Sequence, residues 1–196
     1  MTPSASQDPW TLFDLWFQSA VDRGLLRPDA MTLATVGLDG KPSARVVLYK
    51  GRSGSGLRFF TNYESRKGAE LERVPYAAVV FFWAELERQV RIEGAVEKLS
   101  ATESDAYFST RPRESQLGAW ASPQSQPLHS REQLEQRLAE LREEYAERQV
   151  LRPPHWGGYR LVPDSFEFWT GAAHRLNERW LFRHTDAGWQ RSELAP

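Results

Sequence analysis

An Asp39-Gly40 pair between two segments of alternating apolar residues is the feature that most constrains the fold of this chain. Asp-Gly accepts the positive φ angles of a tight turn, so residues 31–38 and 44–49 are predicted to form a β-hairpin. Further strand patterns recur along the chain and predict a mainly antiparallel, mainly β fold. They cover residues 57–61, 76–83, 89–99, 158–162, 166–169, 179–183 and 189–194.

Helices are predicted where a capping residue precedes an apolar period. Asp8-Pro9 opens a helix that ends at Gly24, and Ser65 opens one that Pro75 closes. Serines followed three residues later by Glu or Gln open two more, at residue 100 and at residue 130, the latter running to about residue 149. The apolar face of the first helix is predicted to hold Leu12, Phe13, Trp16, Phe17, Ala20 and Val21.

The order of these elements predicts an α+β fold in which a closed or half-closed barrel carries flanking helices, because closure removes exposed sheet edges. No repeat or linker divides the chain, so residues 1–196 are expected to form a single domain. Residues 1–8 are expected to be flexible, and the Gly-rich stretch 51–56 is expected to be a flexible loop.

Composition excludes several classes of function. Lys and Arg total 25 against 26 Asp and Glu, which does not fit a nucleic-acid-binding surface. The chain has no cysteine, its four histidines are scattered, and we expect no metal site. Neither a signal peptide nor an apolar stretch of membrane-spanning length is recognisable, so a cytoplasmic protein without membrane contact is expected.

Two groups of cations suggest an anion site. Arg45 lies on the predicted strand 44–49 and Lys50 at its end, and Arg66 and Lys67 follow Ser65 at a predicted helix start. Cations beside free helix N–H groups form a site that phosphate commonly occupies. A solvated Arg-Lys pair on the surface explains Arg66 and Lys67 equally well.

A third group comprises Tyr107, Arg111 and Ser115, whose phenol, guanidinium and hydroxyl can converge on one dianion. Gln124 and Ser125 follow in a polar turn. A hydrogen-bonded loop is the alternative interpretation of both segments.

The last group is Arg175, Asn177 and Arg179, which alternation places on one side of an extended strand. They face a ligand, or else salt-bridge partners such as Glu167 and Glu178. The chain contains no nucleophile motif, P-loop or dinucleotide-binding motif. Separate phosphate-type groups without a nucleophile favour a phosphorylated cofactor that performs the chemistry beside a second phosphorylated ligand.

Together these segments resemble the pyridoxine/pyridoxamine 5′-phosphate oxidase family, from about residue 12 to residue 196. The matching segments are RVVLYK (45–50), FTNYESRKG (60–68), ELERQVRIEG (85–94), YFSTRPRESQLGAWASPQS (107–125), HWGGYRLVP (155–163), EFWTG (167–171), RLNERW (175–180) and the terminal LAP. The resemblance implies a split β-barrel homodimer with FMN at the subunit interface. It also implies oxidation of a phosphorylated B6 vitamer by molecular oxygen, with release of hydrogen peroxide.

Motif by motif, the resemblance implies a substrate-phosphate site of Lys50, Tyr107, Arg111 and Ser115, with Arg175 and Asn177 against the pyridine ring. Arg175, Asn177 and Arg179 are the candidate catalytic residues, Arg175 orienting the substrate and Arg179 stabilising the reduced flavin. The implied FMN contacts are Arg45, Val46, Val47, Leu48, Tyr49, Lys50, Phe60, Thr61, Arg66, Lys67, Gln89, Gln124, Ser125, Trp169 and Arg179.

The sequence departs from the family pattern at three places. Asn177 stands where His is usual, Phe60 stands where Tyr is common, and the segment before the first helix lacks the Arg and Tyr that often cover the substrate. Asn cannot carry charge, so slower turnover or a changed substrate preference is expected. Two alternatives stay open: an oxidase of the same fold for another substrate, and a flavin-binding protein without catalysis.

Overall fold

The computed structural model describes residues 8–196, which form a nine-stranded antiparallel sheet with five α-helices around it. The strand order is β2-β1-β5-β6-β7-β4-β3, and β8 and β9 continue from β7. The strands are β1 (Ala30–Val36), β2 (Pro42–Leu48), β3 (Arg52–Ser53), β4 (Gly56–Asn62), β5 (Tyr76–Trp83), β6 (Arg88–Lys98), β7 (Trp156–Thr170), β8 (Glu178–Thr185) and β9 (Gly188–Glu193). The helices are α1 (Pro9–Asp22), α2 (Arg66–Arg73), α3 (Ala101–Ser109), α4 (Arg113–Ala121) and α5 (Arg131–Glu144), with 3₁₀ turns at Ala84–Leu86 and Ala173–Arg175. The predicted mainly β fold with flanking helices is confirmed.

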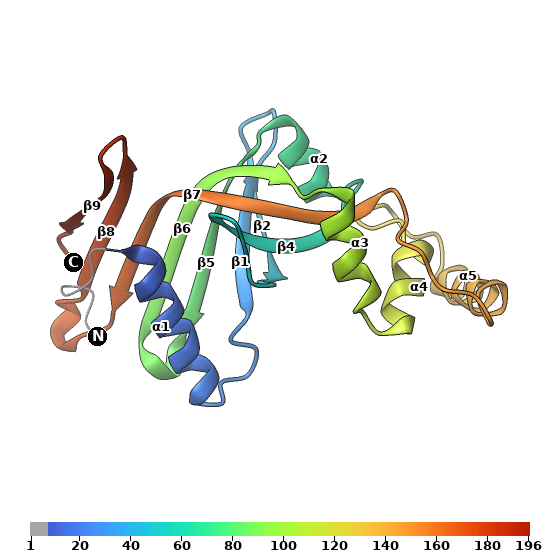
Figure 1. Cartoon of the computed structure of the whole chain (residues 1–196), viewed down its shortest axis with the longest axis horizontal. Coiled ribbons are helices and arrows are strands. Elements are labelled where there is room, and N and C mark those ends of the chain that lie inside the picture. Colours follow the sequence, from blue (N-terminus) through green and yellow to red (C-terminus); the bar gives the residue numbers. More distant parts are fainter. Residues whose placement is uncertain (1–7) are drawn as a thin grey trace.

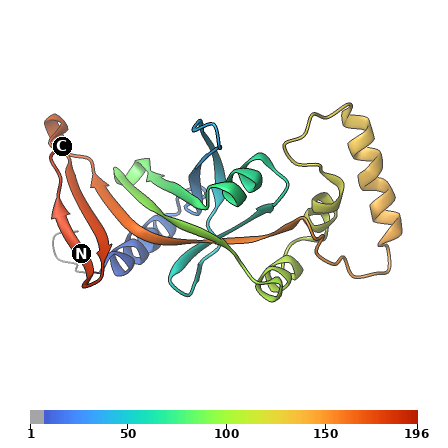
Figure 2. The same ribbon diagram turned by 90° about the horizontal axis from the view of Figure 1, so that it is seen from above.

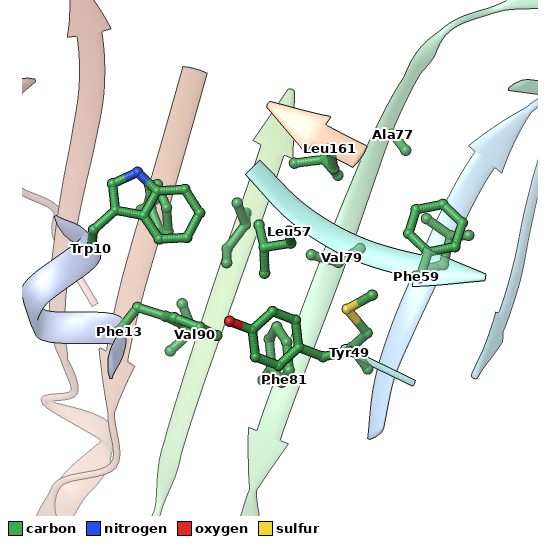
Figure 3. Packing of buried hydrophobic residues seen from close by; sticks show 14 of the residues in the cluster. Trp10, Phe13, Tyr49, Leu57, Phe59, Ala77, Val79, Phe81, Val90 and Leu161 are labelled. Carbon is green, nitrogen blue, oxygen red and sulfur yellow. The ribbon is translucent and has the colours of Figure 1, made fainter. Parts of the chain in front are cut away.

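The main core lies between the curved sheet and α1. Apolar residues of β1, β4, β5, β6 and β7 point inward with the period of two that strands impose, and α1 closes one side of this cluster. Figure 3 shows Phe13 of α1 facing Phe81 and Val90. Phe13 and Phe81 are fully buried, and their rings meet edge to face at 5.2 Å. Burial of this aromatic cluster holds α1 on the sheet.

Helix α1 has the predicted N-cap and the predicted buried face, with one exception. Asp8 is the N-cap and accepts from the backbone N–H groups of Trp10 and Thr11. Five of the six residues expected on the apolar face are buried or half-buried, but Val21 is 42% exposed, so that assignment is wrong. Val21 lies in the last turn, and its neighbour Ala20 supplies the buried position of that turn. The flexibility expected for residues 1–7 lies outside the described residues.

The predicted hairpin forms, but its connection covers residues 37–41 and lies two residues earlier than the predicted strand bounds imply. β1 and β2 pair antiparallel from Ala30–Leu48 to Val36–Pro42. Only Gly40 of the Asp-Gly pair has a positive φ, +74°. The connection is closed by hydrogen bonds from Gly37 N to Lys41 O and from Gly40 N to Gly37 O. The turn is therefore not the two-residue type.

One long strand replaces two predicted ones. β7 runs through Pro163 and Asp164, where its register with β6 shifts between Glu93 and Gly94. A bulge absorbs the extra residue, which allows a proline inside a paired strand. Because β7 pairs with β4, β6 and β8, it links the whole sheet.

The structure differs from the sequence-based prediction at three further places. The stretch 51–56 is not a free loop, since Arg52 and Ser53 pair with Leu57 and Gly56. Residues 113–121 form a helix that the apolar pattern did not predict, and α5 ends at Glu144 instead of near residue 149. Helices α3, α4 and α5 enclose a second apolar cluster that includes Phe108, Leu117 and Trp156.

Figures 1 and 2 place the three helices α3–α5 at one end of β7 and the β8–β9 hairpin at the opposite end. This separation decides how the candidate functional residues are distributed. Among residues 8–196, no helix is long and apolar enough to cross a lipid bilayer.

Candidate functional site

A cleft of about 1200 Å³ lies where β2, β4 and the start of α2 face α3 and α4. Strand β2 forms one wall, and the end of α3 with the first turns of α4 forms the other. The cleft gathers residues from four segments that are far apart in the sequence. Of the predicted site residues, it is lined by Arg45, Val46, Val47, Leu48, Lys50, Phe60, Thr61, Arg66, Lys67, Tyr107, Arg111, Ser115, Gln124 and Ser125.

Lys67 is the most deeply buried cation of this cleft, with 8% of its surface exposed. Its Nζ donates to Thr61 Oγ1 at 3.0 Å and to Ser65 Oγ at 3.2 Å, and lies 3.4 Å from Gln124 Oε1. Burial, together with the nearby charge of Arg45, lowers the pKa of Lys67 to about 8. An anion bound beside this amine would therefore stabilise its charged form.

Arg45 and Arg66 form the remaining cationic part of this wall. Arg66 Nε donates to Glu70 at 2.9 Å, and Arg45 Nη2 approaches the same carboxylate at 3.3 Å. Arg45 also donates to the hydroxyls of Thr35 and Ser43. The two guanidinium groups are thus held at the cleft before any ligand arrives.

Arg111 dominates the opposite wall. Its guanidinium lies over the Trp156 ring at 4.5 Å, and its Nη1 is buried without a hydrogen-bond partner among the described residues. Burial lowers the pKa of Arg111 from its usual value. A buried N–H donor without an acceptor is costly, so this atom fits an anionic group that enters the cleft.

Aromatic stacking orients the neighbouring phenol. Tyr107 stacks on Phe60, with ring centroids 3.8 Å apart and an interplanar angle of 15°, and Trp156 continues the stack at 5.6 Å from Phe60. The hydroxyl that a tyrosine at position 60 would add is absent, but the ring still supports Tyr107. The predicted substrate residues Tyr107 and Arg111 therefore share one aromatic platform.

Lys50 lines the cleft and pairs with Asp29, Nζ to Oδ2, at 2.8 Å. The side chain of the neighbouring Tyr49 points the other way, into the core beside Phe13 and Phe81 (Figure 3). Any contact of Tyr49 with a ligand in the cleft would come from its backbone.

The other predicted site residues lie outside this cleft. Gln89 pairs with Trp169 across β6 and β7, and Trp169 pairs with Arg179 across β7 and β8. Arg179 donates to Glu167 at 3.0 Å and to the carbonyl oxygen of Ala195 at 2.9 Å. Arg179 therefore forms the salt bridge with Glu167 that the sequence offered as the alternative to a ligand contact. These residues belong to the part of the sheet that continues into β8 and β9.

The expectation that three polar residues share one strand face is wrong. Arg175 lies in a 3₁₀ turn, and β8 begins only at Glu178. His174 and Arg175 both have positive φ, 58° and 63°, which is rare for consecutive residues other than glycine. Asn177 Oδ1 accepts a hydrogen bond from Ala172 N at 3.1 Å, which joins the residues on either side of this turn.

Sequence reasoning missed several residues of the cleft. Arg27, Asn62 and Trp156 also line it. Glu70, behind the wall, carried only one sequence signal, its spacing of four residues from Arg66. Within residues 8–196, no group of three or more His, Cys, Asp or Glu side chains could hold a metal ion. The cleft is thus equipped to bind phosphorylated ligands, and it offers cations and aromatic surfaces for this purpose.

Comparison with protein families gives two adjacent matches. Residues 17–145 match the family described as pyridoxamine 5′-phosphate oxidase. Residues 156–196 match the family described as the pyridoxine 5′-phosphate oxidase C-terminal dimerisation region. The second match covers β7, β8 and β9, which carry Trp169 and Arg179.

Curated relatives agree along nearly the whole chain. The pyridoxine/pyridoxamine 5′-phosphate oxidase of Paraburkholderia phytofirmans is 56% identical over 192 residues, covering 97% of this chain and 90% of that protein. The protein of the same name from Microcystis aeruginosa is also 56% identical over 192 residues, with the same coverage.

Two solved structures share the fold. PhzG from Burkholderia lata, in complex with tetrahydrophenazine-1-carboxylic acid, superposes with a TM-score of 0.94 at 32% identity, covering 100% of this chain and 98% of PhzG. A pyridoxamine 5′-phosphate oxidase-related FMN-binding protein from Nostoc punctiforme gives a TM-score of 0.77 at 20% identity, covering 97% and 99%. The predicted split-barrel fold is confirmed.

Proposed function

The chain belongs to the pyridoxamine 5′-phosphate oxidase family, and on that premise we propose that it oxidises pyridoxamine or pyridoxine 5′-phosphate to pyridoxal 5′-phosphate. FMN is the proposed cofactor and molecular oxygen the proposed electron acceptor, which is reduced to hydrogen peroxide. With the amine substrate, the reaction also consumes water and releases ammonia. One observation carries this proposal: a single cleft holds two sets of anion-binding groups on different walls, with Lys50 available to both. A phosphorylated cofactor and a phosphorylated substrate together require two such sets.

The first set serves the cofactor. Arg45, Arg66 and Lys67 carry the positive charge, and Thr61 with Ser125 adds hydroxyl groups. When bound, FMN would supply the redox chemistry, a hydride acceptor for C4′ of the substrate and an electron donor to oxygen. The remaining proposed cleft contacts to FMN are Val46, Val47, Leu48, Lys50, Phe60 and Gln124, with the backbone of Tyr49 beside them.

The second set serves the substrate phosphate. Arg111 offers its unpaired Nη1 donor, and Tyr107, Ser115 and Lys50 line the same cleft. Fixing the phosphate holds the pyridine ring in one orientation, which places C4′ for hydride transfer. Lys50 must exchange its contact with Asp29 for the ligand, or share it between the two.

The residues outside the cleft are proposed to act in a homodimer. The C-terminal segment matches a dimerisation region, and two strands of the sheet expose apolar side chains, Val46 of β2 at 65% and Phe82 of β5 at 61%. In the proposed dimer, Gln89, Trp169 and Arg179 of one protomer reach FMN bound to the other, which sets FMN at the subunit interface. Arg175 and Asn177 would then lie against the pyridine ring, and Arg179 would stabilise the reduced flavin.

An oxidase of the same fold for a different substrate is the second candidate. PhzG, at 32% identity, is bound to a carboxylic acid without phosphate. Such a substrate would leave the donors of Tyr107, Arg111 and Ser115 without an acceptor, which disfavours it here. The relatives at 56% identity favour the phosphorylated vitamers.

The purified protein tests these proposals directly. Its visible spectrum reports bound flavin, and pyridoxamine 5′-phosphate and pyridoxine 5′-phosphate are then added separately in air. Oxygen uptake with equal formation of pyridoxal 5′-phosphate is the expected result. A yellow protein that is inert towards both vitamers would refute the substrate assignment and favour another substrate or a flavin-binding role.

A further inference from the structure

A buried carboxylate lies directly behind the cationic wall of the cleft. Glu70 is 8% exposed and accepts four hydrogen bonds from three different elements. Arg66 Nε donates to it at 2.9 Å and Arg45 Nη2 at 3.3 Å. Thr35 and Ser43, a cross-strand pair of β1 and β2, donate their hydroxyls at 2.5 and 2.7 Å. An acidic residue thus contacts Arg45 and Arg66, two of the cations that line the proposed anion site.

These contacts fix the direction of Arg45 as well as its charge. The same guanidinium donates to Thr35 Oγ1 and Ser43 Oγ, and its Nη1 also lies 3.5 Å from the carbonyl oxygen of Leu33. Arg45 is therefore held in a network of acceptors on β1 and β2. Arg66, whose side chain is 63% exposed, has Glu70 as its ion-pair partner at i,i+4.

Glu70 remains ionised at all pH values at which the protein would be assayed. Burial opposes its ionisation, but hydrogen bonds from Thr35, Ser43 and Arg66 and the charge of Arg45 outweigh this and lower the pKa of Glu70 to about 2. Its negative charge reduces the attraction of the wall for an anion. If Glu70 favours anion binding, its ordering of the two arginine side chains must outweigh this weaker electrostatic attraction.

We propose that Glu70 is a positioning residue for the cofactor site, which holds Arg45 and Arg66 in the orientation that the FMN phosphate requires. This inference rests on the proposed FMN-dependent function. Arginine side chains lose much rotamer freedom when a ligand orders them, and a preformed contact removes that cost at the moment of binding. Glu70 touches neither ligand and acts only through the two arginines.

The chain contains a matched control on the same helix. Glu72 follows two residues later, its side chain is 62% exposed, and it pairs with Lys98 at 2.5 Å, outside the cleft. Glu70→Gln and Glu72→Gln both remove one negative charge from α2. Only the first disturbs Arg45 and Arg66.

The test measures FMN dissociation from holoprotein of wild type and both variants, together with the ³¹P signal of bound FMN and the thermal midpoint. We expect about tenfold weaker FMN binding and a shifted ³¹P signal for Glu70→Gln, the effect of disturbing a charge-assisted hydrogen bond. Glu72→Gln should stay within about twofold of wild type. In the Glu70→Gln background, Arg66→Ala should cost less than it does in wild type, because the two residues act together.

The outcomes distinguish failure of the positioning role of Glu70 from failure of the proposed FMN-dependent function. FMN binding by Glu70→Gln that equals or exceeds wild-type binding would overturn the positioning role and leave the proposed function standing. A wild-type protein that holds no FMN would overturn both. If Glu70→Gln does not fold, Glu70→Asp decides: its side chain is one methylene shorter, so we expect it to lose contact with at least one of the two arginines. Unchanged FMN affinity in that variant contradicts the inference.

Discussion

Raising the pH from 7 to 9 should weaken FMN binding, because Lys67 loses its proton within this range. Its Nζ is enclosed by Thr61 and Ser65, and little of the residue reaches solvent. Burial and the charge of Arg45 lower the pKa of Lys67 to about 8, while Glu70 opposes this in part. In the protein without cofactor, Lys67 is thus mostly charged at pH 7 and mostly neutral at pH 9.

The magnitude follows from proton linkage. A phosphate beside Lys67 stabilises the ammonium form and raises its pKa in the complex. Above the pKa of about 8, binding must therefore include uptake of one proton, and each pH unit costs about 1.4 kcal/mol, or tenfold in affinity. Between pH 7 and pH 9 the FMN dissociation constant should rise about tenfold.

Quenching of FMN fluorescence measures this dissociation constant at pH 7, 8 and 9 and constant ionic strength. Lys67→Met removes the titrating group and should bind FMN more weakly at pH 7, with little change up to pH 9. Lys67→Arg keeps its charge throughout and should also give a flat profile. Ionic strength is held constant because the wall also contains Arg45 and Arg66, whose attraction depends on salt.

Two results would refute this reasoning. A wild-type dissociation constant that does not change between pH 7 and pH 9 would mean that Lys67 does not titrate there or does not meet the phosphate. The same tenfold rise in Lys67→Met would assign the pH dependence to another group.

Three further predictions follow from the fold and the site. Arg111→Met should raise KM for pyridoxamine 5′-phosphate about 10- to 100-fold, because a charge-assisted contact to the phosphate is lost; unchanged KM in steady-state oxygen uptake would exclude this contact. Gly94→Ala should destabilise the protein by more than about 2 kcal/mol in urea unfolding, since the added Cβ would meet the backbone carbonyl of Val162 inside van der Waals contact; a wild-type midpoint would contradict the tight packing at the bulge. Asn177→His should raise kcat/KM, because an imidazole can carry charge beside the substrate ring; identical kcat and KM would show that Asn177 does not limit this enzyme.

The candidate site could be predicted from the sequence as a set of residues, but not as an arrangement. Charge and motif identify Arg45, Lys67 and Arg111 as candidates, and the structure brings them to one cleft. Charge and motif identify Arg179 equally well, yet it lies on β8, paired with Glu167. Motifs identify the residues a family uses, whereas their distribution over the sheet depends on strand order.

Glu70 shows why part of the site escaped prediction. A glutamate on a polar helix is ordinarily solvent-exposed, and its i,i+4 spacing from Arg66 accounts for one contact only. Its contacts with Thr35, Ser43 and Arg45 exist because α2 packs beside the β1–β2 hairpin, about thirty residues earlier in the chain. No local pattern contains that information.

The sequence by itself determined the elements whose causes lie within a few residues. The Asp8 and Ser65 caps, the capping box at Ser100 and the strand alternation of residues 76–83 all appear as predicted. Tertiary structure decided the features that depend on distant partners: the continuity of β7 through Pro163, the opposite ends occupied by α3–α5 and β8–β9, and the carboxylate behind the cleft. Capping and periodicity are short-range effects, whereas strand pairing and burial depend on which distant segments meet.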